Sequence, residues 1–177
     1  MSRVLIVGNG TSLLDVPRGQ VIDSFDEVVR FNSFKIQGFE EFTGTKTTTW
    51  FTCNKAHIKK SFPRVVWHSW QKDKSNDPNF QTIKEHFPNA DSVGWDVIEE
   101  ARELAPIPDN FKAPSTGLLA ILFFLREVES VKIVGFDWWA TDKHHYGDNE
   151  KRGTLHKPEI ESTIICKLIG KEKLTFL

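Results

Sequence analysis

The chain has 177 residues, of which 39% are hydrophobic and 27% charged, with a formal net charge of -1. This length suits one α/β domain with a substantial core, and the composition excludes a disordered chain. The near-zero net charge excludes a general attraction to nucleic acid, and the longest apolar run, Leu118–Leu125, is too short to cross a bilayer. No signal peptide precedes the first predicted strand, and two cysteines without metal-ligand spacing indicate free thiols, so we expect a cytoplasmic protein. The sequence is compatible with peripheral contact with the inner membrane and with formation of a homo-oligomer.

The chain opens on a predicted strand, Val4–Val7, followed by a polar turn, Gly8–Ser12, and the start of a helix. Four consecutive aliphatic residues indicate a strand covered on both faces, as in a parallel sheet. Glycines permit a sharp turn and a close ligand, and the free N–H groups where a helix begins favour an anion. The turn has neither dinucleotide-binding nor Walker A spacing, so it predicts either a ligand cradle or an ordinary tight turn.

Strands and helices alternate along the rest of the chain. We expect strands over residues 28–31, 47–52, 64–67, 131–134 and 173–177. We expect helices over residues 80–86, 95–104, 118–127 and 156–169, a polar connection over 16–24 and a mobile lid loop over about 140–155. The apolar run after Ser115 predicts a central buried helix that this serine caps. The alternation predicts a single α/β domain over residues 1–177, a Rossmann-like three-layer sandwich with a mostly parallel sheet.

Polar side chains follow the ends of several predicted strands. They are Asn9, Asn32, Asn54 and Asp137, while Ser115 and Thr116 open the buried helix. Because ligands of such folds bind at the carboxyl ends of the strands, we expect these side chains to meet at one edge of the sheet. Turn chemistry explains any one asparagine, but the set favours a site for a ribose, a base edge or a sugar hydroxyl.

These residues lie within an ordered set of motifs that resembles the sialyltransferases. The segments are VGNGTSL, SFDEVVRFNSF, PSTGLLAILFFL, VKIVGFDWW and HKPEIE. The likeness is closest to the small bacterial enzymes of glycosyltransferase family 42, which sialylate lipooligosaccharide. The eukaryotic family 29 shares the pattern, since Pro114–Gly117 resembles its small motif, His145–Tyr146 its third motif and His156–Glu161 its very small motif.

The resemblance implies a GT-A-like variant of the predicted fold and a role for each matching residue. In this pattern Asn9, Gly10 and Ser12 contact the cytidine monophosphate (CMP) part of the donor. Asn32 contacts the sugar or the phosphate of the donor, and Asn54 binds the sialyl group. The carboxylate or the ribose of the donor is received by Ser115, Thr116 and Gly117. We add Asp137 to this substrate-binding set because it ends a predicted strand at the same edge.

The resemblance also places the general base at His156 and leaving-group donors at Trp139 and Tyr146. Inversion at the anomeric carbon in one displacement needs a base on the acceptor hydroxyl, and a histidine titrates near neutral pH. A phenol or an indole N–H can donate to the departing phosphate as its charge grows. A single phosphate carries less charge than a diphosphate, and the chain has no Asp-x-Asp pair, so we expect no metal and no cofactor. A metal site around His144 and His145 is the less favoured alternative.

Together these features predict an inverting, metal-independent glycosyltransferase with a CMP-sialic acid donor. It would transfer sialic acid, or a related keto-sugar acid, to a hydroxyl of a glycan or glycolipid acceptor. Trp139 stands where the bacterial enzymes have a tyrosine, and the lid is shorter than theirs. A short lid excludes water less well, so donor hydrolysis or a different acceptor is the first alternative. A nucleotide-binding module without catalysis is the second.

Overall fold

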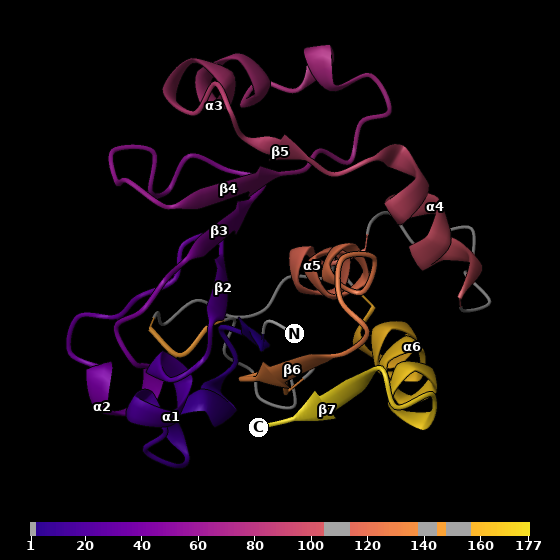
Figure 1. Cartoon of the computed structure of the whole chain (residues 1–177). Helices are drawn as coiled ribbons and strands as arrows, with labels where there is room; N and C mark the ends of the chain where they lie inside the picture. The colour runs from indigo at the N-terminus through magenta and orange to yellow at the C-terminus, as the bar shows by residue number, and fades with distance from the viewer. Residues whose placement is uncertain (1–2, 105–113, 138–144, 148–156) are drawn as a thin grey trace.

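The computed structural model describes residues 3–104, 114–137, 145–147 and 157–177 (Figure 1). Its strands are β1 (Val4–Val7), β2 (Glu27–Phe31), β3 (Thr49–Thr52), β4 (Arg64–Trp67), β5 (Asp91–Ser92), β6 (Val131–Val134) and β7 (Leu174–Phe176). Its α-helices are α1 (Gly19–Asp23), α2 (Glu40–Thr43), α3 (Phe80–His86), α4 (Trp95–Glu103), α5 (Thr116–Phe124) and α6 (Pro158–Gly170). Short 3-10 turns cover Thr11–Leu14 and Lys74–Asn76.

The strands form one parallel sheet in the order β5-β4-β3-β2-β1-β6-β7 (Figure 1). The chain starts at β1 inside the sheet, runs outward as far as β5, and returns to β6 on the other side of β1. The direction of strand addition therefore reverses beside β1. In folds of this kind the loops at such a reversal open a ligand crevice at the carboxyl ends of the strands.

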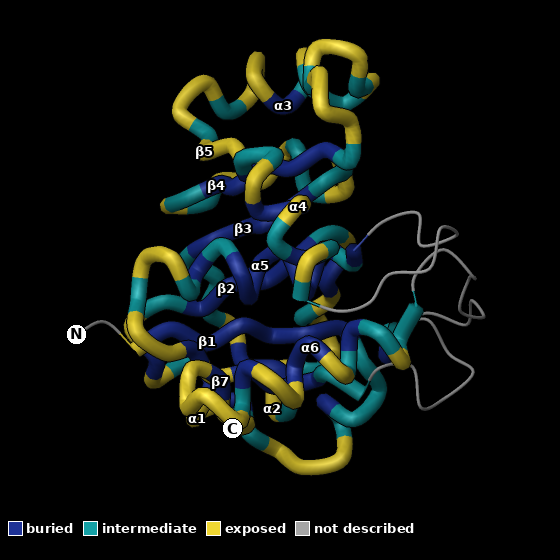
Figure 2. The backbone as a smooth tube through the Cα atoms, turned by 90° about the vertical axis from the view of Figure 1, so that its right-hand side faces the viewer, coloured by how far each residue is buried: buried dark blue, intermediate teal, exposed yellow. Residues whose placement is uncertain are grey.

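Helices cover both faces of the sheet, because successive strand residues point to opposite faces and both sets are apolar. On one face, Ile6 and Phe51 belong to a core cluster with residues of α4, α5 and α6. On the other face, Leu5 packs in a cluster with α1, and Trp50 packs in a cluster with α3. Figure 2 shows β1 to β4 and α5 as a mostly buried interior, whereas β5 at the edge of the sheet is exposed. This arrangement is the predicted three-layer sandwich.

The central helix α5 is buried at every residue except Phe123, as expected for a helix that is apolar on all sides. Ser115 caps it, since its Oγ accepts a hydrogen bond from the Leu118 N–H at 3.2 Å. The hydrophobic length of α5 thus packs in the core while its polar first turn lies at the carboxyl edge of the sheet. None of the described helices is long and apolar enough to cross a membrane.

The predicted strands and the predicted helices over 80–86, 95–104, 118–127 and 156–169 are confirmed, with boundaries that differ by at most three residues. The helix predicted directly after the first strand is wrong, because Thr11–Leu14 forms only one 3-10 turn. The connection expected over 16–24 contains α1, and α2 and β5 were not predicted. The lid predicted over about 140–155 lies outside the described residues except for 145–147.

Candidate active site

A cavity of about 260 Å³ lies at the carboxyl ends of β1, β2, β3 and β6, against the first turn of α5. Eight of the nine predicted substrate-binding residues line it: Asn9, Gly10, Asn32, Asn54, Ser115, Thr116, Gly117 and Asp137. The rest of the described lining consists of Gly8, Phe31, Ser33, Trp70, Gly135, Phe136, His145 and Glu161. The ninth predicted residue, Ser12, is not part of the lining. The cavity coincides with the reversal of strand order, where this fold class binds ligands.

Glycines let the loops after β1 and β6 approach each other closely at this point. The Gly8 N–H donates to the Val134 carbonyl at 2.7 Å, and the Gly10 N–H donates to the Gly135 carbonyl at 2.9 Å. A Cβ at Gly8 would overlap the Gly135 carbonyl group. Gly135 has φ 71°, a conformation that favours glycine. Backbone atoms therefore form this side of the cavity.

Asp137 holds the turn after β1 in place. Its Oδ2 accepts hydrogen bonds from Thr11 Oγ1 at 3.1 Å and from the Ser12 N–H at 3.2 Å. A carboxylate at the start of a helical turn is favourable, because it accepts from N–H groups that have no partner within the turn. The N–H group of Ser12, at the turn expected to favour a ligand anion, is therefore occupied by a carboxylate of the chain.

Asn9 presents an unsatisfied acceptor at the cavity. Its Nδ2 donates to the Phe31 carbonyl at 3.2 Å, which joins the ends of β1 and β2. Its Oδ1 is buried and has no hydrogen-bond partner among the residues that the structure describes. Leaving a buried carbonyl oxygen unpaired costs free energy, so an N–H or O–H of a ligand that reached this atom through a small movement of the side chain would be bound favourably.

Asn32 joins the ends of β2 and β3 to the start of α5. Its Oδ1 accepts from the Cys53 N–H at 3.1 Å, and its Nδ2 donates to Thr116 Oγ1 at 3.1 Å. Its backbone has φ 51°, which asparagine tolerates better than most residues. The indole N–H of Trp50 donates to the Asn32 carbonyl at 3.1 Å and helps to hold this conformation.

Ser115 is bound by a carboxylate of the chain. Its N–H donates to Glu161 Oε1 at 2.7 Å and its Oγ donates to Glu161 Oε2 at 2.5 Å. Burial raises the pKa of Glu161 to about 7, although both hydrogen bonds from Ser115 favour its charged form. Glu161 lies in the first turn of α6, so this pair fixes α6 to the start of α5 at the cavity. The role predicted for Ser115 toward a ligand carboxylate stays a prediction.

Asn54 and Gly117 also line the cavity. Asn54 Oδ1 accepts from the Ala56 N–H at 2.9 Å, which orders the loop after β3. A Cβ at Gly117 would press against the rings of Phe136 and Phe31, at 2.8 and 3.3 Å. Glycine at this position therefore allows an aromatic wall to lie directly against α5.

Of the three predicted catalytic residues, the described part of the structure contains Tyr146 alone. Tyr146 is buried beside the cavity, where its hydroxyl donates to the Lys35 carbonyl and its N–H donates to the Asn9 carbonyl at 3.0 Å. Burial raises the pKa of this phenol. Trp139 and His156 lie outside the described residues. The predicted roles of all three stay predictions.

The charge of the cavity is set by carboxylates. Asp137 and Glu161 belong to its lining, and no lysine or arginine does among the described residues. Within the described ranges, no group of three or more His, Cys, Asp or Glu side chains is placed to hold a metal ion. An anionic ligand in this part of the site would therefore be bound through N–H and O–H donors.

Sequence reasoning did not identify Trp70, Phe136 or the contact of Glu161 as parts of the site. The Trp70 indole N–H donates to the Pro114 carbonyl at 3.0 Å, just before the helix cap. A signal for Glu161 was available, because it falls on the buried stripe of α6 with Ile164 and Leu168. A carboxylate on such a stripe requires hydrogen-bond donors. Trp70 carries no comparable signal, since aromatic residues are common throughout this chain.

Comparisons with known proteins identify the family of the chain. The model of glycosyltransferase family 29 (sialyltransferase) matches residues 1–92. The chain is 48% identical to the Homo sapiens CMP-N-acetylneuraminate-beta-1,4-galactoside alpha-2,3-sialyltransferase. The alignment is 213 residues long and covers 99% of this chain and 57% of that protein. It is 26% identical to the Gallus gallus CMP-N-acetylneuraminate-beta-galactosamide-alpha-2,3-sialyltransferase 1, with 98% and 57% covered. The chain thus spans little more than half the length of these relatives.

Two solved structures share the fold. A mammalian sialyltransferase superimposes with a TM-score of 0.73 at 23% identity, covering 99% of this chain and 68% of that one. The sialyltransferase CstII from Campylobacter jejuni, in complex with cytidine-5'-monophosphate, superimposes with a TM-score of 0.67 at 16% identity, covering 100% and 80%. At these identities the likeness concerns the fold alone.

Proposed function

Because the chain belongs to glycosyltransferase family 29, the sialyltransferase family, we propose that its cavity binds CMP-sialic acid and that the chain transfers the sialyl group to a glycan hydroxyl. The observation that supports this most is the convergence of eight predicted substrate-binding residues on one cavity at the strand reversal. Those residues come from four strand ends and one helix start, and the unpaired Oδ1 of Asn9 leaves an acceptor for a ligand donor.

The proposed reaction is a single displacement that inverts the anomeric centre. His156 takes the proton of the acceptor hydroxyl, the freed oxygen forms a bond to the anomeric carbon, and the bond from that carbon to the phosphate oxygen breaks. The electron pair of that bond leaves on CMP, and Tyr146 and Trp139 are the proposed donors to the departing phosphate. To donate, the Tyr146 hydroxyl would exchange its hydrogen bond with the Lys35 carbonyl for one with the phosphate. Glu161 supports this assignment of the base, because it follows His156 by five residues and lines the cavity.

No metal or cofactor takes part in the proposed reaction. The leaving group carries one phosphate, whose charge hydrogen-bond donors can balance without a metal ion. We expect a chelator to leave the rate of transfer unchanged. A rate that falls on chelation and returns with added divalent cation would contradict this part of the proposal.

The proposed acceptor is a terminal galactoside of a glycan or glycolipid. The relative that is 48% identical is, by its name, a sialyltransferase for β-1,4-galactosides, which makes such a sugar the first acceptor to test. Lipooligosaccharide, the acceptor of the bacterial enzymes, is the second. We also propose a cytoplasmic location with peripheral contact to the inner membrane, which cell fractionation would test.

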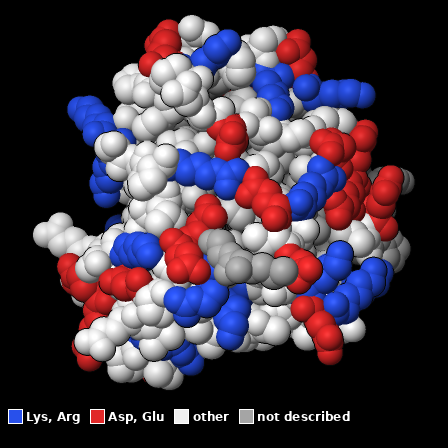
Figure 3. Space-filling view, viewed as in Figure 1, with Lys and Arg blue, Asp and Glu red and all other residues white. Residues whose placement is uncertain are grey.

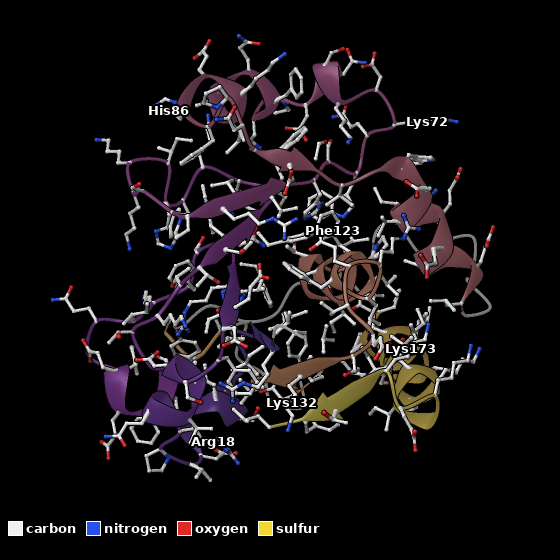
Figure 4. All side chains as sticks on the ribbon, in the orientation of Figure 1. Arg18, Lys72, His86, Phe123, Lys132 and Lys173 are labelled. Atoms are coloured by element: carbon white, nitrogen blue, oxygen red, sulfur yellow. The ribbon has the colours of Figure 1, made fainter. Side chains whose placement is uncertain are left out.

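The test is a transfer assay with CMP-sialic acid and a β-1,4-galactoside, on the wild type, His156→Ala and His86→Ala. His86 lies on α3, is not part of the cavity lining (Figure 4), and its ring Nδ1 lies 3.0 Å from the Thr82 carbonyl oxygen of the same helix, so its variant is the matched control. We expect His156→Ala to lose about 100-fold or more in rate while it keeps its donor affinity, the size typical of a general base. His86→Ala should match the wild type.

Three results would contradict the proposal in different ways. Release of CMP without a sialylated product would indicate donor hydrolysis. Binding of CMP without turnover would indicate a nucleotide-binding module. An unchanged rate in His156→Ala would remove that residue from the mechanism.

A further inference from the structure

A buried histidine lies behind the cavity lining and contacts one of the residues that form it. His68 follows β4, is fully buried and is not part of the cavity lining. Its Nε2 lies 3.0 Å from Thr116 Oγ1, the hydroxyl that also contacts Asn32 and lines the cavity. The same hydroxyl thus joins the end of β2, the start of α5 and the end of β4.

The direction of the Asn32 contact can be assigned without ambiguity. The Cys53 N–H can only donate, so the side-chain atom of Asn32 that lies 3.1 Å from it is the carbonyl oxygen. The other side-chain atom is therefore the amide nitrogen, and it donates to Thr116 Oγ1. One lone pair of the Thr116 hydroxyl is occupied by this bond.

The state of His68 then decides what Thr116 offers to a ligand. A hydroxyl has one hydrogen to donate and two lone pairs that accept. With a hydrogen on Nε2, His68 occupies the second lone pair. The hydroxyl hydrogen of Thr116 is then left for the cavity or for Cys53 Sγ, a weak acceptor at 3.8 Å that an anionic oxygen would displace. Without that hydrogen, Nε2 takes the hydroxyl hydrogen, and Thr116 offers the cavity only a lone pair.

The composition of the cavity favours the first state. The proposed donor substrate brings a phosphate and a carboxylate, while the described lining has no lysine or arginine. Ser115 has already given its N–H and hydroxyl hydrogen to Glu161. The hydrogen of Thr116 would stabilise an anionic oxygen bound at the start of α5, and a lone pair at that position would repel it.

We propose that His68 is a positioning residue whose Nε2–H directs the hydroxyl hydrogen of Thr116 to an anionic oxygen of the bound donor. This inference rests on the function proposed above. It assigns to a residue outside the cavity the task of making Thr116 a hydrogen-bond donor. The anionic oxygen belongs either to the phosphate or to the sialyl carboxylate.

The test is a double-mutant cycle on ligand affinity, measured by calorimetry without acceptor. The variants are His68→Leu, Thr116→Val and the double variant, and the ligands are cytidine, CMP and CMP-sialic acid. We expect His68→Leu to weaken CMP-sialic acid binding about tenfold, the size of one hydrogen bond to a charged group. In the Thr116→Val background the same change should cost less than about twofold, because the hydroxyl is already absent.

Two controls separate this role from packing. Phe51→Leu alters the ring that packs on His68 at a centroid distance of 5.7 Å, and it should lower thermal stability without changing the ratio of the three affinities. His68→Gln keeps an N–H donor near the position of Nε2, and it should keep CMP-sialic acid binding within about threefold of the wild type. His68→Gln also keeps the test valid if His68→Leu fails to fold.

The ligands distinguish the two anionic groups. A loss that first appears with CMP identifies the phosphate, and a loss that appears only with CMP-sialic acid identifies the carboxylate. Equal losses for all three ligands, or an equal loss in the Thr116→Val background, would overturn the role of His68. A wild type that binds none of the three would contradict the proposed function itself.

Discussion

At the amino ends of the strands Arg64 pairs with three carboxylates, whereas at the carboxyl ends the polar groups are mostly uncharged amides and hydroxyls. Arg64 Nε lies 2.8 Å from Asp91 Oδ2, and its two terminal nitrogens lie 2.6 and 2.8 Å from the carboxylate oxygens of Glu127. Glu27 adds a longer contact of 3.6 Å. Figure 3 shows the molecule in the view of Figure 1, with blue and red side chains intermingled around α5 and β4.

This difference between the two edges indicates that the amino edge contributes to stability and the carboxyl edge to ligand binding. At the amino edge Arg64 is matched by partners of opposite charge, and it also lies over the ring of Phe123, which is labelled in Figure 4. At the carboxyl edge the Oδ1 of Asn9 has no partner among the described residues, and Asn32 adopts an uncommon backbone conformation. Such groups also occur on the amino side, at Thr47 Oγ1 and at Glu172, but at the carboxyl edge they belong to residues that line the cavity.

The largest expected effect is that of Gly8→Ala at the carboxyl edge. A methyl group there would overlap the Gly135 carbonyl and force the loops after β1 and β6 apart. We expect a loss of about 3 kcal/mol of unfolding free energy, at the upper end for overpacking, together with the loss of nucleotide binding. Gly170→Ala is the matched control, because a Cβ there would meet nothing within 4 Å. Chemical denaturation measures the unfolding free energy of both variants. Wild-type stability in Gly8→Ala would contradict the close packing of the two loops at the carboxyl edge.

The next effect concerns Glu161, whose pKa burial raises from 4.5 to about 7. The folded state binds this proton more tightly than the unfolded state, so the stability it contributes is present below pH 4.5 and is lost as pH rises to about 7. We expect the wild type to lose on the order of 2 kcal/mol between pH 5 and pH 8 from this group.

Glu161→Gln should flatten that pH dependence, because the amide does not titrate. It should also release the Ser115 hydroxyl hydrogen toward the cavity, since the amide nitrogen can donate to Ser115 Oγ. Glu159→Gln, two residues away on the exposed side of α6, is the control and should leave the slope unchanged. Thermal unfolding across this pH range gives the answer, and an equal slope in wild type and Glu161→Gln would contradict the assignment.

The smallest effect is expected from Arg64→Met at the amino edge. Loss of the ion pairs should cost about 1 kcal/mol, because the arginine is partly exposed and solvent screens its partners. The difference from the wild type should shrink at 1 M salt, and nucleotide affinity should not change. The control is Lys132→Met. Lys132, which is labelled in Figure 4, is a cation that has no ion pair in the described part of the chain. A change in affinity with Arg64→Met would show that the two edges are coupled.

The sequence predicts the sheet well where strands are aliphatic on both faces, as in Val4–Val7, because that pattern follows directly from burial. It predicts the strand-end amides for the same reason, since the residues after such runs share one edge. It does not predict β5, whose two exposed residues, Asp91 and Ser92, lack an apolar run. It also does not predict α1, whose five residues are too few to show helical periodicity.

Polar contacts between residues far apart in the chain could not be predicted from the sequence. Ser115 and Glu161 are 46 positions apart, and His68 and Thr116 are 48 apart. No local pattern relates such residues, because their meeting depends on how α5, α6 and β4 pack around the sheet. The cap at Ser115 was predicted from its neighbours, whereas its carboxylate partner required the tertiary structure.

The claim that the cavity at the carboxyl edge is a cytidine nucleotide site is tested most directly by calorimetry. The full chain would be titrated with CMP, and with the corresponding uridine, adenosine and guanosine monophosphates under the same conditions. We predict that CMP binds at least about tenfold more tightly than each of the others. Equal affinities, or a preference for another base, would contradict the account.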